Sequence, residues 1–472
     1  MAGKFRFVYS KNQFKPNMKR INLALFLLIF FGLSIEATAQ DPWTRLFNGK
    51  NLKGWKQLNG FARYTVKDGA IVGSTVAGSP NSFLCTTQDY SDFILEFEVW
   101  VDSRLNSGVQ VRSHSYPAYQ NGRVHGYQVE IDPSDRAWSA GIYDEARRAW
   151  LYTLADNPDA RRAFRKNEWN LYRVEAIGTS IRVWLNGVPA SNLTDDMDAS
   201  GFIGLQVHGI GDDPANSGIQ VKWRNIRIIT REPEKYRLPM PPSVREISAI
   251  PNTLTGWEIA QGWKLLWDGK TTLGWRGADK TAFPEKGWEI KDRCLNVQGA
   301  SGGESANGGD IVTTAKYKDF ELQVDFRLSQ GANSGIKYFV VEGLNKGVGS
   351  AIGLEYQLLD DANHPDALAG VGGNRTCAGL YDLIPPLDGK ALNPPGQWNT
   401  ARIMAKGNLV EHWLNGKKTV EYERGTQIFR ALVQKSKYSV YPAFGEATEG
   451  PILLQDHGNQ VSFRNIKIRI LN

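Results

Sequence analysis

The decapeptide GYQVEIDPSD at residues 126–135 carries three carboxylates at a spacing that suits bond-breaking chemistry. Glu130, Asp132 and Asp135 stand at positions i, i+2 and i+5. Because side chains on a β-strand alternate between its faces, Glu130 and Asp132 would share one face of a sheet. Two carboxylates on one face are what acid/base cleavage of a glycosidic bond requires. The stretch therefore raises the hypothesis of a sugar-cleaving site, which the rest of the chain must test.

An internal repeat provides that test. Five short segments recur in the same order: 46–55 as 266–275, 92–108 as 319–335, 140–144 as 378–382, 184–187 as 413–416 and 224–228 as 464–468. Such a repeat predicts a duplicated domain. We expect a first domain at 41–230, a Pro-rich linker at 231–261 and a second domain at 262–472.

The residue pattern of each copy indicates β structure. In FELQVDFRL at 320–328 apolar and polar residues alternate, as in a half-buried antiparallel strand, and Asn-Gly pairs mark tight turns between such runs. Helix signals are scarce, and the clearest is 426–438 with Thr426 as N-cap. The sequence therefore predicts an all-β chain of two tandem jelly-roll β-sandwich domains.

The N-terminal segment has the features of a targeting signal. A basic stretch ending at Arg20, an apolar run at 21–35 and small residues before Gln40 predict a signal peptide within 1–39, cleaved after Ala39. This segment carries six basic side chains against one acidic, so only +2 of the chain's net charge of +7 belongs to the remainder. We therefore expect an exported protein that binds no nucleic acid and inserts in no membrane. The three cysteines show no metal-ligand spacing, and we expect buried free thiols.

The second copy changes the interpretation of the carboxylate motif. There Glu355 and Gln357 stand where the first copy has Gln128 and Glu130, and the i, i+2, i+5 spacing is lost. Both copies keep one amide and one carboxylate alternating on a strand, followed by Asp. The first-copy pattern is that of laminarinase-type glucanases, but it ends in Asp135 where those enzymes carry Glu. A glucanase thus remains only an alternative hypothesis.

Several segments of the second copy together resemble the 3-keto-disaccharide hydrolase family. They include LWDGKTTLGW, NSGIKYF, GLEYQLLDDANHPDA, GLYDLIPP and ILLQDHGNQVSFRNIKIR, and the resemblance extends over 262–472 and, less closely, over 41–230. The resemblance implies a concanavalin-A-like jelly roll, export to the periplasm, and cleavage of glycosides whose sugar carries a ketone at C3. Such a ketone acidifies the C2 hydrogen, so a base, an acid and a donor for the enolate oxygen are needed.

The candidate residues of the second copy follow from that chemistry. We expect Glu355 or Asp360 as base, His457 or His364 as acid, and Lys337 as stabiliser of the enolate. Side chains expected to bind the sugar are Gln357, Asp361, Tyr381 and Asp382. Clustered Asp360 and Asp361 are also compatible with an Asx turn or a bound calcium, and we expect no other cofactor.

The first copy departs from this pattern, because Gln110 stands opposite Lys337 and no HPD segment follows Asp132. Its expected sugar-binding residues are Arg112, Gln128, Glu130, Asp132, Tyr143 and His208. The partner is in every case an oligosaccharide or glycoside. A non-catalytic tandem of carbohydrate-binding domains is the alternative from another functional class.

Overall fold

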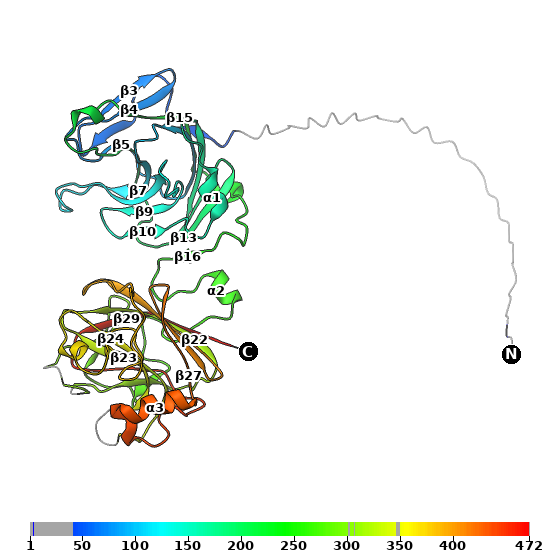
Figure 1. Cartoon of the computed structure of the whole chain (residues 1–472). Coiled ribbons are helices and arrows are strands. Elements are labelled where there is room, and N and C mark those ends of the chain that lie inside the picture. Colours follow the sequence, from blue (N-terminus) through cyan, green and yellow to red (C-terminus); the bar gives the residue numbers. More distant parts are fainter. Residues whose placement is uncertain (1–2, 4–40, 301–302, 306, 346–349, 472) are drawn as a thin grey trace. The chain divides into compact units, whose positions relative to one another are not determined.

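The computed structural model describes residue 3 and residues 41–300, 303–305, 307–345 and 350–471. The expected signal peptide lies outside the described residues, apart from Gly3. A compact unit begins at Trp43. Within that unit each half of the sequence forms its own pair of β-sheets (Figure 1).

The first domain is a sandwich of two sheets that are antiparallel except for the short parallel pair β13–β16. Its larger sheet has the order β16-β13-β12-β11-β6-β15-β4-β3, with β1 beside β15. The strands are β1 Thr44–Arg45, β3 Arg63–Lys67, β4 Ala70–Ser74, β6 Phe93–Val101, β11 Asn170–Ile177, β12 Ser180–Leu185, β13 Val188–Thr194, β15 Gln220–Ile229 and β16 Ile247–Ser248. The smaller sheet has the order β10-β9-β8-β7-β14-β5-β2. Its strands are β2 Trp55–Leu58, β5 Ser82–Thr86, β7 Ser107–His114, β8 His125–Ile131, β9 Ile142–Glu145, β10 Ala149–Tyr152 and β14 Phe202–Val207.

The second domain repeats this plan. Its larger sheet has the order β19-β20-β29-β22-β25-β26-β27, with β17 beside β29. The strands are β17 Lys264–Leu265, β19 Trp288–Lys291, β20 Cys294–Val297, β22 Phe320–Leu328, β25 Trp398–Lys406, β26 Leu409–Leu414, β27 Lys417–Glu423 and β29 Val461–Ile470. The smaller sheet has the order β18-β21-β28-β23-β24. Its strands are β18 Trp275–Gly277, β21 Ile311–Thr313, β23 Asn333–Val341, β24 Ile352–Leu359 and β28 Leu453–Leu454.

The two domains share one topology, which confirms the predicted duplication. The run β13-β12-β11-β6-β15-β4-β3 matches β27-β26-β25-β22-β29-β20-β19, and β8-β7-β14-β5-β2 matches β24-β23-β28-β21-β18. The first domain adds β9 and β10 at the edge of its smaller sheet. The prediction of two tandem jelly-roll sandwiches is therefore correct.

Alternating side chains place the core between the sheets of each domain. On β22 the side chains of Phe320, Leu322 and Val324 belong to the apolar core, whereas those of Glu321, Gln323 and Asp325 lie on the other face of the strand. In the smaller sheet of the second domain, burial does not alternate as it does on β22, because every residue of β24 is buried. One face of β24 meets the apolar core, and the polar side chains of Glu355 and Gln357 on its other face are buried as well.

Helices are few and short among the described residues. They are α1 Pro158–Ala163, α2 Gly256–Ala260 and α3 Gln427–Lys435, with 3-10 turns η1 Pro214–Asn216, η2 Pro233–Tyr236, η3 Pro365–Leu368 and η4 Lys437–Val440. The predicted helix is α3, and the Thr426 side chain caps it by accepting the amide of Phe429. The expected linker contains β16, which pairs in parallel with β13, so part of it extends a sheet. Cys85, Cys294 and Cys377 are buried free thiols, as expected.

Candidate active site

The candidate site of the second domain is built on the paired strands β23 and β24. Lys337 lies opposite Glu355, and Gly335 lies opposite Gln357. Since their neighbours Ile336, Tyr338, Leu354 and Tyr356 face the apolar core, the side chains of Lys337, Glu355 and Gln357 share the other face. A Cβ at position 335 would stand 2.3 Å from Oε1 of Glu355. Gly335 thus makes the space that the carboxylate occupies.

A second buried carboxylate, that of Asp310, lies beside Lys337. The Lys337 Nζ atom is 3.5 Å from Oδ2 of Asp310, and the two residues are 5% and 1% exposed. Burial disfavours the charged carboxylate and raises the pKa of Asp310 to about 7, although Lys337 opposes this. Burial also disfavours the ammonium, but Asp310 and Glu355 outweigh it and raise the pKa of Lys337. Lys337 is therefore a cation at neutral pH.

The carboxylate of Glu355 is oriented by a tyrosine from outside the sheet. The hydroxyl of Tyr438 donates to Oε2 of Glu355 over 3.3 Å. Tyr438 lies on η4, directly after α3, and its ring stacks on Phe444 with centroids 4.0 Å apart. Burial, together with the charge of Glu355, raises the pKa of Tyr438 well above its usual value. Tyr438 is accordingly a permanent hydrogen-bond donor to Glu355.

A chain of polar side chains continues from Gln357 to two histidines. Gln357 Nε2 donates to Oδ1 of Asn333 at 3.2 Å, and Asn333 Nδ2 lies 3.5 Å from Nε2 of His457. The rings of His457 and His364 are 6.3 Å apart. His364 Nδ1 accepts the amide of Asp366, so its proton sits on Nε2 in the neutral form. Burial and the neighbouring His457 lower the pKa of His364.

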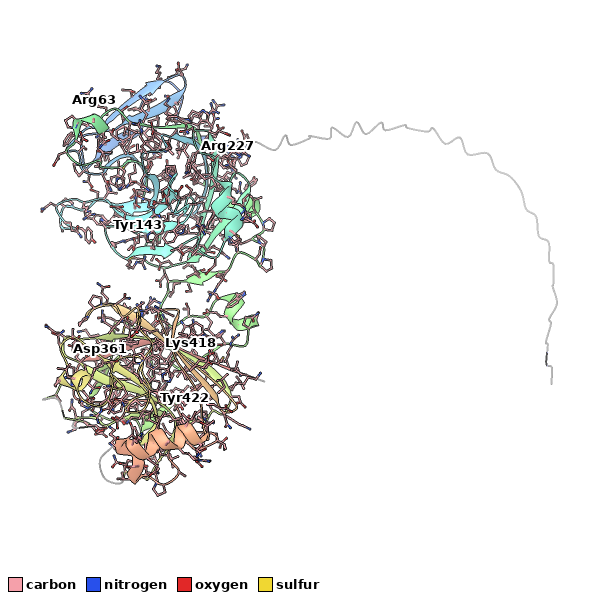
Figure 2. All side chains as sticks on the ribbon, in the orientation of Figure 1. Arg63, Tyr143, Arg227, Asp361, Lys418 and Tyr422 are labelled. Carbon is pink, nitrogen blue, oxygen red and sulfur yellow. The ribbon has the colours of Figure 1, made fainter. Side chains whose placement is uncertain are left out.

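Asp360 and Asp361, the two aspartates that follow β24, have partners in the surrounding loops. Asp360 Oδ2 accepts the amide of Gly331 and the side-chain amide of Asn363, each at 2.7 Å, so its carboxylate closes a turn. Asp361, which is labelled in Figure 2, accepts the amide of Cys377 at 2.7 Å and pairs with Lys390 at 2.5 Å. Both carboxylates are engaged in holding loops. Of the two candidate bases, Glu355 is the one that lies beside Lys337.

Tyr381 and Asp382 are held by an ion-pair network. The Tyr381 hydroxyl donates to Oδ2 of Asp366 at 2.8 Å. Arg375 pairs with Asp366 at 3.1 Å and with Asp382 at 2.7 Å. The second oxygen of Asp382 accepts the amide of Lys437 at 2.7 Å, which ties η4 to this loop. Asp382 thus positions the segment that carries Tyr438, and Tyr381 keeps its ring near Glu355.

Sequence reasoning missed three side chains of this buried face. They are Asp310, Gln455 and Tyr438. Gln455 Nε2 lies 3.4 Å from Glu304, and its Oε1 has no hydrogen-bond partner among the described residues. The repeat contained a clue to Asp310. A displacement of 227 residues aligns Asp310 with Phe83, so an aspartate stands where the otherwise similar strand of the first copy has a phenylalanine. Tyr438 had no such clue, since α3 and η4 have no counterpart between β13 and β14.

The equivalent strands of the first domain carry amides in place of these charges. Gln110 lies opposite Gln128, and Gln110 Nε2 donates to Oε1 of Gln128 at 2.7 Å. Gln128 Nε2 in turn donates to Oε2 of Glu130 at 3.0 Å. Burial raises the pKa of Glu130, although Asn106 donates to its other oxygen at 2.7 Å. Glu130 is thus a buried carboxylate with two amide donors.

A cavity of about 360 Å³ lies over these strands. Its wall includes Gln128, Glu130, Tyr143 and His208, four of the residues predicted to bind sugar (Figure 2 labels Tyr143). Arg112 does not line it, because its guanidinium bonds to carbonyls of Ser91 and Gly178 and to Asp92.

The carboxylate motif of residues 130–135 does not converge on the cavity. Asp132 is not among the wall residues, and its carboxylate bonds to the amide of Ser134 and to Arg136. Asp135 is fully exposed and pairs with Lys166. Glu130 and Asp132 are both paired with Arg136, whereas Asp135 lies apart from them at the surface. This geometry lends no support to a glucanase site.

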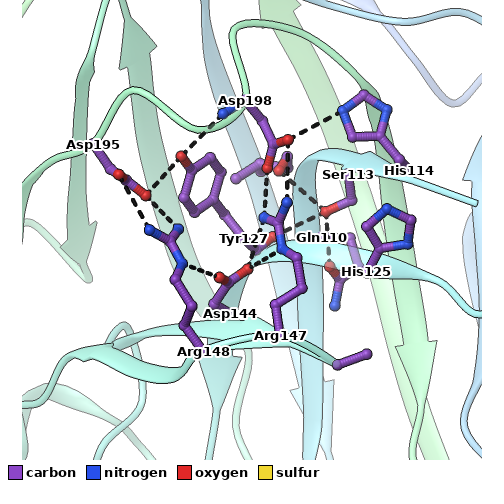
Figure 3. A network of polar contacts seen from close by, with 12 residues as sticks. Gln110, Ser113, His114, His125, Tyr127, Asp144, Arg147, Arg148, Asp195 and Asp198 are labelled. Carbon is purple, nitrogen blue, oxygen red and sulfur yellow. Dashed lines mark hydrogen bonds and ion pairs between the residues drawn. The ribbon is translucent and has the colours of Figure 1, made fainter. Parts of the chain in front are cut away.

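A network of ion pairs fixes the strand that carries Tyr143 (Figure 3). Asp144 is fully buried and pairs with Arg147 at 2.7 Å and Arg148 at 2.5 Å. Arg147 also pairs with Asp198, and Arg148 with Asp195. Asp144 occupies the place of Asp382 in the repeated AG-x-YD segment. In both domains this aspartate is therefore structural, and it fixes the tyrosine before it.

Comparison with known proteins agrees with the repeat. The chain matches the family model of the 3-keto-alpha-glucoside-1,2-lyase-like domain twice, over residues 42–229 and 262–469. The chain belongs to this family. A curated relative from Bacteroides thetaiotaomicron, named 3-keto-disaccharide hydrolase, is 41% identical over 233 residues, which covers 45% of this chain and 80% of the relative.

Two crystal structures from Parabacteroides distasonis ATCC 8503, both of candidate glycosyl hydrolases, are also similar. The first is 33% identical and covers 47% of this chain and 100% of that one, with a TM-score of 0.41. The second is 26% identical and covers 44% and 99%, with a TM-score of 0.32.

Both copies are thus 3-keto-alpha-glucoside-1,2-lyase-like domains, with different side chains at their equivalent sites. Within the described part of the chain, no three His, Cys, Asp or Glu side chains are grouped so that they could hold a metal ion. No helix of the described residues is long and apolar enough to cross a membrane.

Proposed function

We propose that this chain is an exported enzyme that cleaves 3-keto-glycosides in its second domain. Family membership and the curated relative named 3-keto-disaccharide hydrolase support a carbohydrate-cleaving enzyme. The observation that supports the finer assignment is the register of β23 and β24, which sets Lys337 opposite Glu355 on one face of the sheet, where the charge of Glu355 acts on Lys337. A base next to a cation is the arrangement needed to form an enolate.

The reaction begins with proton transfer from C2. In this proposal the carboxylate of Glu355 takes the C2 proton, and the electron pair moves toward the C3 carbonyl, whose oxygen becomes an enolate beside the Lys337 ammonium. Electrostatic stabilisation of such an oxyanion in a buried site is a large contribution to catalysis. Tyr438 holds the Glu355 carboxylate in place through its hydroxyl.

Cleavage follows when the enolate expels the substituent at C1. The C1–O bond breaks, the leaving oxygen takes a proton from His364 or His457, and a C1=C2 double bond remains conjugated with the ketone. Water then adds across this bond, with hydroxide at C1 and a proton returned to C2, so the net change is hydrolysis. The two imidazole rings lie 6.3 Å apart, and His364 carries its neutral-form proton on Nε2.

The test compares a 3-keto-disaccharide with its unoxidised parent. The wild-type chain should release a reducing sugar from the oxidised compound alone, and Lys337→Met should abolish most of this activity. Exchange of the C2 hydrogen with deuterated solvent should also require Glu355. Equal cleavage of the unoxidised parent, or no cleavage of either sugar, would rule out the proposed reaction. Single His364→Gln and His457→Gln variants would identify the acid.

Export is the second part of the proposal. It is supported by the basic stretch, the apolar run at 21–35 and the small residues that precede Gln40.

A further inference from the structure

The first domain has lost the ionisable groups that the second domain places at its site. The same displacement of 227 residues relates Phe83 to Asp310, Gln110 to Lys337 and Gln128 to Glu355. The strand registers confirm the equivalence for the last two pairs, since Gln110 faces Gln128 as Lys337 faces Glu355. A base, a cation and a buried acid are therefore replaced by two amides and a phenyl ring.

A buried amide in the same domain has no partner. Gln206 on β14 is 0% exposed, and neither its Nε2 nor its Oε1 has a hydrogen-bond partner among the described residues. Leaving such a group unpaired in the interior of a protein is unfavourable. Its side chain lines the cavity of about 360 Å³. An amide offers one donor and one acceptor side by side, which is what two neighbouring sugar hydroxyls bind.

The rest of the cavity wall has the chemistry of a site for a neutral sugar. Carboxylates and guanidiniums are balanced in it, with Glu130 and Glu145 against Arg123 and Arg136. Each pair is in contact, since Arg136 lies 3.2 Å from Glu130 and Arg123 3.6 Å from Glu145. The lining charges thus compensate each other and favour no anion. The volume is within the range of small-molecule sites.

An aromatic wall completes the cavity. Trp150 and Tyr143 line it, with their rings 5.2 Å apart and nearly perpendicular. Arg136 packs on the Trp150 ring at 4.8 Å, which holds this indole in place. The apolar face of a pyranose packs well on such a ring. A larger cavity of about 760 Å³ shares Asn81, Arg123 and Glu145 with this one, so there is room for more than one sugar unit.

We propose that the first domain binds a neutral, unoxidised sugar in this cavity and does not cleave it. With Gln110 and Gln128 in place of the cation and base, no carboxylate stands at the position of Glu355 and no ammonium at that of Lys337. Glu130, the carboxylate that this strand pair does carry, is held by the amides of Asn106 and Gln128 and by Arg136. A hydroxyl at C3 both donates and accepts, and so satisfies both atoms of Gln206, whereas a ketone can only accept. The proposal concerns binding and does not depend on the reaction proposed for the second domain.

Titration calorimetry on the full chain tests this inference. The probes are maltose, cellobiose and lactose, with glucuronic acid as a charged sugar. We expect one neutral disaccharide site per chain and no comparable site for glucuronic acid. Gln206→Leu removes two hydrogen bonds and should weaken binding by about tenfold or more, since 1.4 kcal/mol is one order of magnitude. Trp150→Ala, a change in the cavity wall, should weaken it similarly.

The matched control is Gln455→Leu, the equivalent change in the second domain, which should leave the affinity for the neutral disaccharide unchanged. Absence of binding by the wild-type chain would overturn the inference. So would full affinity in both folded Gln206→Leu and Trp150→Ala, or loss of binding in Gln455→Leu alone. Failure of the 3-keto-glycoside reaction would leave these binding measurements unaffected, so the two proposals fail separately.

Discussion

At the scale of single residues, the structure separates two carboxylates that the sequence left equivalent. Glu355 lies on the polar face of β24 beside Lys337, and a tyrosine hydroxyl orients it. Asp360 follows the same strand, but its carboxylate accepts hydrogen bonds from the amide of Gly331, in the loop between β22 and β23, and from the side chain of Asn363. Both side chains end in a carboxylate. Under the proposed reaction the carboxylate of Glu355 is catalytic, whereas that of Asp360 holds a loop in place.

These surroundings predict opposite phenotypes for two conservative variants. Glu355→Gln should lower kcat on a 3-keto-glucoside by about 10²–10⁴-fold, the usual contribution of a general base, with little loss of stability. Asp360→Asn removes an acceptor of two hydrogen bonds and should lower the free energy of unfolding by about 1–3 kcal/mol. Single-turnover rates and denaturant unfolding measure the two effects. A large rate loss in a fully stable Asp360→Asn variant would make Asp360 the base instead.

Asp310 should give the second domain a pH-dependent stability. Its pKa is about 7 in the folded protein, because burial disfavours its charge, but about 3.9 in an unfolded chain. Between pH 4 and pH 7 the carboxyl of Asp310 is protonated in the folded state but ionised in the unfolded state. The contribution of Asp310 to the free energy of unfolding is therefore greatest below about pH 4, and it is lost as the pH rises to about 7.

Asp310→Asn cannot titrate and keeps an oxygen that accepts the amide of Asp456. The difference in Tm between the wild type and this variant should therefore decline from pH 4 to pH 7 and become constant above it. Scanning calorimetry at closely spaced pH values measures this difference. A difference independent of pH would show that Asp310 is already ionised in the folded protein at low pH.

At the scale of elements, two paired strands determine the site geometry, and one glycine permits it. A Cβ at Gly335 would meet Oε1 of Glu355 at 2.3 Å, a distance that forces the carboxylate to move. Gly335→Ala should thus lower turnover by about 10²-fold, as a shift of about 1 Å in a reacting group can do. Gly256→Ala is the control, because the nearest atom to its Cβ lies 3.8 Å away. Retained turnover in Gly335→Ala would mean that Glu355 is not the reacting group.

The sequence alone predicted those elements that are determined by residues close together in the chain. Alternation on β22, the Thr426 cap of α3 and the Asn-Gly turns are all set by residues a few positions apart. The pairing of Lys337 with Glu355 also lay within reach, since β23 and β24 are consecutive strands.

Partners from distant segments were not predictable in this way. Arg112 is expected from its position to face the sugar, but it bonds to Ser91 and Gly178, which lie on other loops. Asp310 joins Lys337 because β21 and β23 both pair with β28, whose sequence lies more than a hundred residues further on. A period of two residues assigns a face to each side chain, but it does not say which strand lies beside it.

At the scale of the whole molecule, the duplication lets two equivalent sites diverge. Each domain keeps its sheets, its AG-x-YD tyrosine and the glycine that opens space beside the central strand pair. Each therefore retains a buried polar face whatever its chemistry. At its central strand pair the second domain carries Lys337 and Glu355, where the first domain carries Gln110 and Gln128. Under the two proposals, cleavage and binding of sugars are therefore distributed over one chain.

Export makes a prediction about the intact protein in the cell that produces it. The basic stretch, apolar run and small residues of the N-terminal segment should direct secretion, and the mature chain should begin near Gln40. Removal of residues 1–39 takes away six basic and one acidic side chain, so the net charge should fall from +7 to about +2. Mass spectrometry of the protein released by periplasmic extraction measures the new N-terminus, and isoelectric focusing measures the lower pI. An Ala39→Arg variant is the control, because a bulky charged residue at the cleavage position should leave the segment attached. Recovery of the wild-type chain with Met1 or Met18 intact, in the membrane fraction, would show instead that the segment anchors the protein.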